Sequence, residues 1–296
     1  MSLPVRRPLG ARRARRPARR RRADGALPRL NIWRLLGVAL MLLSGAALYW
    51  LMTADDFALE PEHIALGELR YTDDGLVHST MAPWLQGSRN VFLLRAAEME
   101  RALAGLPAVA EAEVAVVLPD RLEVALVERE PVFVWRTGGS DYLVDASGVL
   151  LREVLAGEAL PADLPLVDDR RRLPEPVRPG DVMPAVDLRA VLTLGAVDPE
   201  LLASSAQWLS LAVEQADGYV LSAEPAGWRA IFGHYTPTLR PPDIIERQVQ
   251  CLRSLLATAE HDLDTIYLAP AEERCGTYLA RNTPEPSPED DNDHDE

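Results

Sequence analysis

Two cysteines, Cys251 and Cys275, are the side chains of this 296-residue chain best suited to covalent chemistry. A thiol beside an imidazole can act as a nucleophile, so Cys275 with His234 or His261 supplies the residue types of a Cys–His hydrolase. If both cysteines lie on the oxidising side of a membrane, a disulfide is the stronger interpretation. We expect a Cys251–Cys275 disulfide, with two buried free thiols as the alternative. The hydrolase remains a second functional hypothesis.

Other residue sets that catalyse reactions or hold ligands are missing from the sequence. The chain has no lysine, which excludes a Walker A phosphate loop and any Ser–Lys or Schiff-base mechanism. It contains neither the zinc-binding motif H-E-x-x-H nor the nucleophile-elbow motif G-x-S-x-G. Its five histidines, at positions 63, 78, 234, 261 and 294, are not paired at metal-ligand spacing. We therefore expect a chain that is not an enzyme, with no catalytic residue, no cofactor, no metal site and no small-molecule substrate.

The charge is distributed unevenly along the chain. Residues 1–34 hold twelve arginines against the single acid Asp24, a balance of +11, so the other 262 residues must carry −25 to give the net charge of −14. Twenty uncharged residues then separate Arg34 from Asp55, and as a helix they would span roughly 30 Å, the thickness of the bilayer core. Aromatic residues that favour the lipid interface lie at both ends: Trp33, Tyr49 and Trp50. The sequence predicts one transmembrane helix over residues 33–54.

The arginines before this span and the acids after it predict its orientation. They favour a cytoplasmic N-terminus and an extracytoplasmic bulk, which is a single-pass type II protein of the cell (inner) membrane. A cleaved signal peptide is the alternative, because Ser44-Gly45-Ala46 resembles a cleavage site, although the apolar run continues beyond it. The arginine-rich tail, residues 1–32, is predicted to be disordered. No aromatic residue interleaves its arginines, so we expect contact with the lipid bilayer rather than with nucleic acid.

Residues 55–129 are predicted to form a two-layer α+β domain. An extended segment over 57–66, interrupted by Pro61, is followed by a helix that Asp73 and Asp74 can cap. A second amphipathic helix runs from Arg95 to Leu106. Residues 112–126 then alternate apolar and polar side chains around a Pro119-Asp120 turn, which predicts an antiparallel hairpin. The expected order is therefore strand, helix, helix, strand, strand.

The stretch from Leu106 to Trp135 resembles the end of an FtsQ-type POTRA domain. Its letters, L-P-A-V-A-E-A-E-V-A-V-V-L-P-D-R-L-E-V-A-L-V-E-R-E-P-V-F-V-W, follow the family pattern L-x-x-x-P-x-V-x-x-A-x-V, then P-x-x-L-x-V-x-V-x-E-R-x-P-V-x-x-W. G-S-R-N-V-F-L-L at 87–94 resembles the stretch before the second helix, and D-Y-L-V-D-A-S-G-V at 141–149 resembles the opening of the next domain. We identify the chain as similar to the FtsQ/DivIB family, closely over about residues 33–150.

Residues 130–281 are predicted to form a second, mainly antiparallel β domain with flanking helices. Short strands are expected around 132–135, 142–144 and 149–151. Residues 152–197 read as loop, and Asp198-Pro199 predicts a short helix through about Gln207. The remaining predictions are strands at 209–213, 218–222, 228–232, 265–268 and 276–280, and a helix starting at Pro242-Asp243. Where the family tends to show Asp-Leu-Arg, this chain has Tyr267-Leu268-Ala269.

The resemblance implies a function that the residue types alone do not. FtsQ and DivIB proteins are components of the bacterial divisome, so the resemblance implies a scaffold that recruits division proteins at the septum. Its implied partners are membrane proteins of the FtsB and FtsL type. A POTRA protein of secretion or outer-membrane assembly is a third hypothesis, but no long series of alternating strands follows here.

The partner-binding surface is predicted at the last strand. An exposed edge can pair with a partner strand through main-chain hydrogen bonds. The acidic residues 282–296 are predicted to be disordered, so nothing ordered would cover the strand before them. The predicted binding edge is Gly276, Thr277, Tyr278, Leu279 and Ala280.

Overall fold

The computed structural model describes residues 32–86, 90–270 and 274–281. The predictions for the arginine-rich and acidic tails lie outside the described residues. The chain divides into two compact units, residues 1–51 and 52–296.

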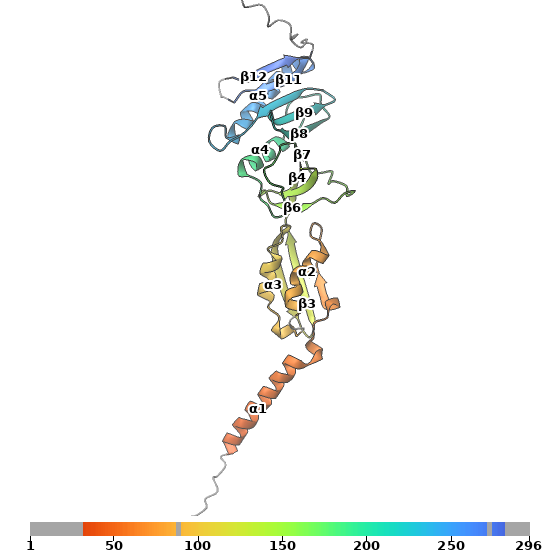
Figure 1. The fold of residues 1–296 in the computed structure, drawn as a ribbon, viewed down its shortest axis with the longest axis vertical. Coiled ribbons are helices and arrows are strands. Elements are labelled where there is room, and N and C mark those ends of the chain that lie inside the picture. Colours follow the sequence, from red (N-terminus) through yellow and green to blue (C-terminus); the bar gives the residue numbers. More distant parts are fainter. Residues whose placement is uncertain (1–31, 87–89, 271–273, 282–296) are drawn as a thin grey trace, which may run out of the picture. The chain divides into compact units, whose positions relative to one another are not determined.

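Helix α1, Ile32–Thr53, carries the apolar segment (Figure 1). It is 22 residues long and none of its residues is buried. Its length and composition are those of a membrane span, and its bounds lie within one residue of the predicted ones. The helix therefore fits the single-pass anchor expected from the sequence.

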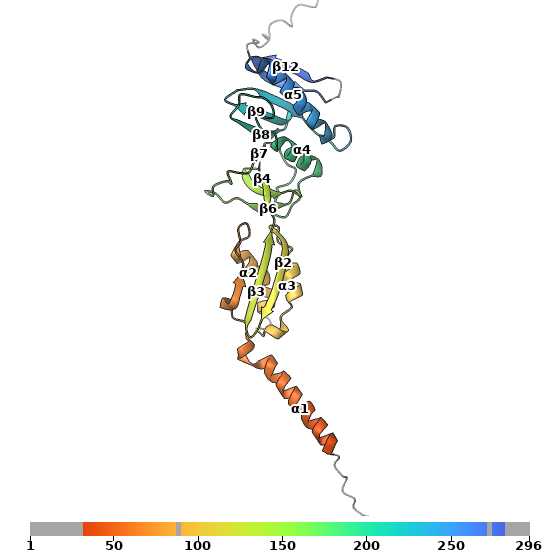
Figure 2. The same cartoon turned by 180° about the vertical axis from the view of Figure 1, so that it is seen from behind.

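A three-stranded sheet with two helices begins the second unit (Figures 1 and 2). The sheet order is β1-β3-β2, in which β1 runs parallel and β2 antiparallel to β3. Side chains from both helices and from the sheet form one buried cluster. The elements are β1 (Ile64–Leu66), α2 (Asp74–Leu85), α3 (Ala96–Leu103), β2 (Val109–Val117) and β3 (Arg121–Glu128). The predicted order is confirmed.

The segment expected to be extended over 57–66 is only partly a strand. Asp55–Phe57 and Pro61–His63 form short 3₁₀ turns, and only the last three residues pair with β3. Proline has no N–H for a strand ladder, which favours a turn at this point. The predicted cap is present, because the Asp73 carboxylate accepts a hydrogen bond from the Leu76 N–H at 3.0 Å.

A nine-stranded sheet forms the rest of the unit, in the order β12-β11-β10-β9-β8-β7-β4-β5-β6. Five neighbouring pairs are antiparallel and three are parallel, so the sheet is mainly antiparallel, as predicted. Its strands are β4 (Pro131–Thr137), β5 (Ser140–Asp145), β6 (Leu150–Glu153), β7 (Leu166–Asp169), β8 (Trp208–Glu214), β9 (Gly218–Glu224), β10 (Arg229–Gly233), β11 (Leu263–Leu268) and β12 (Gly276–Ala280).

Helices α4 (Ala185–Gly195) and α5 (Ile245–Ala259) pack against this sheet and complete its main core. In α5 the predicted apolar stripe is buried: Ile245, Val249, Leu252 and Leu256. The core continues into β11, where Ile266 and Leu268 are buried in the same cluster. The helix that precedes the last two strands is thus held firmly by apolar packing.

Two sequence predictions in the middle of the chain are wrong. Residues 152–197 contain β7 and α4 instead of loop alone, because their short buried segments are masked by the surrounding Pro, Asp and Arg. The helix expected from Asp198 does not continue. Its cap forms, with the Leu201 N–H donating to the Asp198 carboxylate, but Ala203 adopts a φ of 52° and ends the turn.

Candidate binding edge at strand β12

The two ends of the nine-stranded sheet differ in how their edges are covered. At the β6 end, residues 180–182 run alongside the strand. The Leu150 N–H donates to the Asp181 carbonyl at 2.9 Å, and the Gly180 N–H donates to the Leu150 carbonyl at 2.8 Å. At the other end, β12 pairs with β11, and within the described part of the chain no strand pairs with its outer side. The β6 edge is therefore covered at its first residue, whereas the β12 edge, at the position predicted for partner binding, is open along its described length.

Hydrogen bonds at both ends of β12 show which backbone groups face outward. The Ala269 N–H donates to the Cys275 carbonyl at 3.2 Å, and the Arg281 N–H donates to the Asp262 carbonyl at 2.8 Å. Because alternate residues of an antiparallel strand bond the same neighbour, Thr277 and Leu279 also face β11. The N–H and C=O groups of the intervening residues point away from the sheet. These outward-facing residues are Gly276, Tyr278 and Ala280.

Exposed apolar side chains accompany this free backbone. All five residues of β12 are exposed, with Tyr278 at 54% and Leu279 at 48%. Tyr278 lies opposite Ile266, whose side chain is buried in the core that α5 completes. Leu279 lies on the other face of the sheet, which it shares with Tyr267. An added strand would therefore find apolar contacts on both faces.

Three features hold β12 in place beside β11. A disulfide joins Cys275, the residue before the strand, to Cys251 in α5. After the strand, the Arg281 guanidinium donates to the carbonyls of Ala226 and Leu263. Gly276 has a φ of 137°, and a Cβ on this residue would lie 2.0 Å from the Tyr267 carbonyl oxygen. Only glycine fits at the start of the strand.

The residues considered for hydrolase chemistry are not arranged as a nucleophile and base. The Cys275 sulfur is bonded to Cys251, and a ring nitrogen of His234 lies 3.2 Å from the carbonyl oxygen of Ala216. In the described ranges, no group of three or more His, Cys, Asp or Glu side chains is placed to hold a metal ion.

Comparison with known proteins shows which proteins the chain is similar to. The description "POTRA domain, FtsQ-type" matches residues 82–129. The "Cell division protein FtsQ" of Chloroflexus aggregans is 30% identical over 157 residues, which is 53% of each chain. The protein of the same name from Chloroflexus aurantiacus is 43% identical over 84 residues, 27% of this chain and 29% of that one. A third, from Koribacter versatilis, is 34% identical over 90 residues, 30% of this chain and 23% of that one. The chain contains an FtsQ-type POTRA domain and is similar to FtsQ cell division proteins. It spans about half the length of the first of these relatives, and less of the other two.

The E-R pair, Glu128 and Arg129, lies where β3 ends and β4 follows. The Glu128 carboxylate accepts hydrogen bonds from three consecutive backbone N–H groups, those of residues 70–72, at 2.6 to 2.9 Å. Arg129 donates to the Asp145 carboxylate at 3.0 Å and to the Val109 carbonyl at 3.3 Å. Burial alone would raise the pKa of Glu128, but the hydrogen bonds outweigh it and the pKa is lowered. The pair therefore ties the POTRA strands to neighbouring segments.

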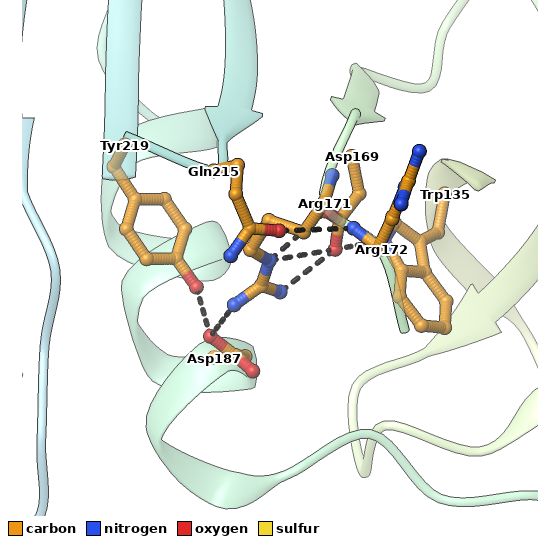
Figure 3. Close-up of polar contacts among 7 residues, drawn as sticks. All are labelled: Trp135, Asp169, Arg171, Arg172, Asp187, Gln215 and Tyr219. Carbon is orange, nitrogen blue, oxygen red and sulfur yellow. Dashed lines mark hydrogen bonds and ion pairs between the residues drawn. The ribbon is translucent and has the colours of Figure 1, made fainter. Parts of the chain in front are cut away.

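A buried polar network in the nine-stranded sheet domain was not predicted from the sequence (Figure 3). The Asp169 carboxylate accepts hydrogen bonds from the Trp135 indole N–H at 3.3 Å and from the Arg171 guanidinium at 2.7 Å. Arg171 also donates to Asp187 at 3.2 Å, and the Tyr219 hydroxyl donates to the same carboxylate. Burial and the Asp187 charge raise the pKa of Tyr219. Residues 168–172, Asp-Asp-Arg-Arg-Arg, are visibly charged in the sequence, but the sequence does not show which of these side chains are buried.

Proposed function

We propose that this chain is a membrane-anchored scaffold of bacterial cell division. It would recruit and hold other division proteins at the septum through its extracytoplasmic domains. Three observations support the proposal: the FtsQ-type POTRA domain, the cell division proteins to which the chain is similar, and one helix able to span a membrane. The N-terminus would lie in the cytoplasm, as the charge balance around the span favours.

The open edge at β12 is the observation that carries a binding mechanism. Three residues point backbone donors and acceptors outward, and exposed apolar side chains flank them. A partner strand would extend the sheet by main-chain hydrogen bonds and gain specificity from contacts with Tyr278 and Leu279. The proposed partners are division membrane proteins of the FtsB and FtsL type.

Proline at Tyr278 tests this mechanism because it removes an outward-facing donor and leaves the bonds from Thr277 and Leu279 to β11. We expect Tyr278→Pro to reduce copurification of full-length protein with the FtsB and FtsL proteins of its own organism by tenfold or more. Tyr278→Ala is the matched control, because it removes the ring and keeps the N–H. An unchanged thermal unfolding midpoint would show that Tyr278→Pro still folds. Full-strength copurification of a folded Tyr278→Pro variant would rule out this edge.

A cellular experiment tests the wider role. Depletion of the protein should give filamentous cells, and a fluorescent fusion should concentrate at midcell. Normal division of depleted cells, with an evenly distributed fusion, would contradict the proposal.

A further inference from the structure

Cys275 combines two properties that are seldom found at a structural disulfide: it is exposed, and it adjoins an open strand edge. Cys275 is exposed to solvent, whereas Cys251 is only 9% exposed. A thiolate must reach a sulfur atom to exchange with a disulfide, so access decides which sulfur is attacked. Here the exposed residue of the pair is the one directly before β12, so its sulfur is the expected point of attack.

The disulfide is a covalent attachment directly before β12. All five residues of the strand are exposed, and none of them belongs to the buried core cluster. Its described non-covalent attachments are the β11 ladder and the hydrogen bonds of Arg281. Segments with exposed side chains and few buried contacts open locally at low free energy. Without the tether, β12 is the part of the sheet that would open first.

The other end of the tether is fixed independently. In α5, Leu252 and Leu256 are buried in the main core. Gln248 is also buried and donates to the carbonyls of Phe232 at 3.3 Å and Ala269 at 3.2 Å. Loss of the disulfide would therefore leave α5 in place and release only the edge strand.

We propose that Cys275 is a thiol–disulfide exchange site through which an extracytoplasmic dithiol reductant controls the β12 edge. One reductant thiolate attacks the Cys275 sulfur, forms a mixed disulfide with it and expels the Cys251 thiolate, which takes up a proton. The second reductant thiol then attacks the mixed disulfide and releases the Cys275 thiol. The protein gains two thiols, and the reductant is oxidised to its disulfide. The oxidised chain has an ordered edge, and the reduced chain does not.

This inference rests on the proposed role of β12, but its tests need no partner. Full-length protein in detergent micelles is treated briefly with reduced glutathione, quenched with acid and mapped by mass spectrometry. We expect glutathione on Cys275 in at least a tenfold excess over Cys251. Equal labelling, or labelling mainly on Cys251, would overturn the assignment of the exchange site.

Hydrogen exchange of the same preparation tests the control of the edge. After reduction with dithiothreitol, the amides of Thr277, Leu279 and Arg281 should exchange at least tenfold faster, while those of α5 and β9 keep their rates. A variant with Cys251→Ser and Cys275→Ser should exchange fast at these positions with or without reductant. Unchanged exchange on reduction would overturn the proposal. If exchange responds as expected but Tyr278→Pro still copurifies with its partners, the edge is redox-sensitive and the proposed binding role fails.

Discussion

Glu128 shows how one side chain can organise a junction between two sheets. Its carboxylate accepts the N–H groups of residues 70–72, while the next residue, Arg129, pairs with Asp145 beyond β4. Hydrogen bonds to a charged acceptor contribute more than neutral ones, about 1.5–3 kcal/mol each before coupling between them is considered. Glu128 and Arg129 carry part of the family resemblance. Their presence is explained by the hydrogen bonds that Glu128 accepts from backbone N–H groups and by the ion pair of Arg129 with Asp145.

The lowered pKa of Glu128 gives a pH-dependent prediction. Because the folded pKa lies below the ordinary value of 4.5, the stabilisation is present above pH 4.5 and is lost as pH falls through the folded pKa. Glu128→Gln should lower the free energy of unfolding at pH 7, and this deficit should shrink below pH 4.5. Urea unfolding of the full-length wild type and variant at several pH values measures it. A deficit that stays constant down to pH 3 would contradict the assigned role.

At the scale of elements, a buried network couples β7 to α4. The Asp169 side chain is fully buried and binds Arg171, which reaches Asp187 in the first turn of α4. A buried pair contributes little net stability relative to apolar packing, yet removing one partner leaves the other charge without compensation. The network thus makes the position of α4 depend on an intact ion pair.

Asp169→Ala should destabilise the protein by about 3 kcal/mol because it leaves the partly buried Arg171 without its nearest carboxylate. The neighbouring residue offers a matched control, since Asp168 pairs with the exposed Arg170 on the surface. We expect Asp168→Ala to change stability by less than about 1 kcal/mol. Chemical unfolding of both full-length variants makes the comparison, and equal effects would show that the burial of Asp169 is not what matters.

The helices and strands also show which sequence patterns were sufficient to predict them. Strong alternation and helical stripes predicted β2, β3 and α5, because their apolar residues recur with the period of the structure. Strand β7 was missed because a buried parallel strand of four residues has no visible period. The edge position of β12 could be predicted from its place before a polar tail. The outward direction of the Tyr278 N–H could not, because it depends on pairing with β11.

At the scale of the whole molecule, the charge asymmetry predicts a fixed topology. Protease added to right-side-out spheroplasts that express the full-length protein should digest residues beyond the span and leave a protected N-terminal fragment. Replacing the arginines of residues 12–22 with serine should reduce the share of correctly oriented chains, because positive charge holds the N-terminus inside. A domain that resists protease until the membrane is lysed would contradict this orientation.

The two edges of the nine-stranded sheet differ in how they are covered, and this affects where a further strand can be added. A sheet with two open edges can join copies end to end without limit, which is the route to fibres. Here residues 180–182 bond the first residue of β6, whereas within the described residues no strand pairs with the outer side of β12. Strand addition along a whole edge of this sheet is therefore available at β12. A strand added at β12 would therefore extend the sheet from the edge opposite the segment 180–182.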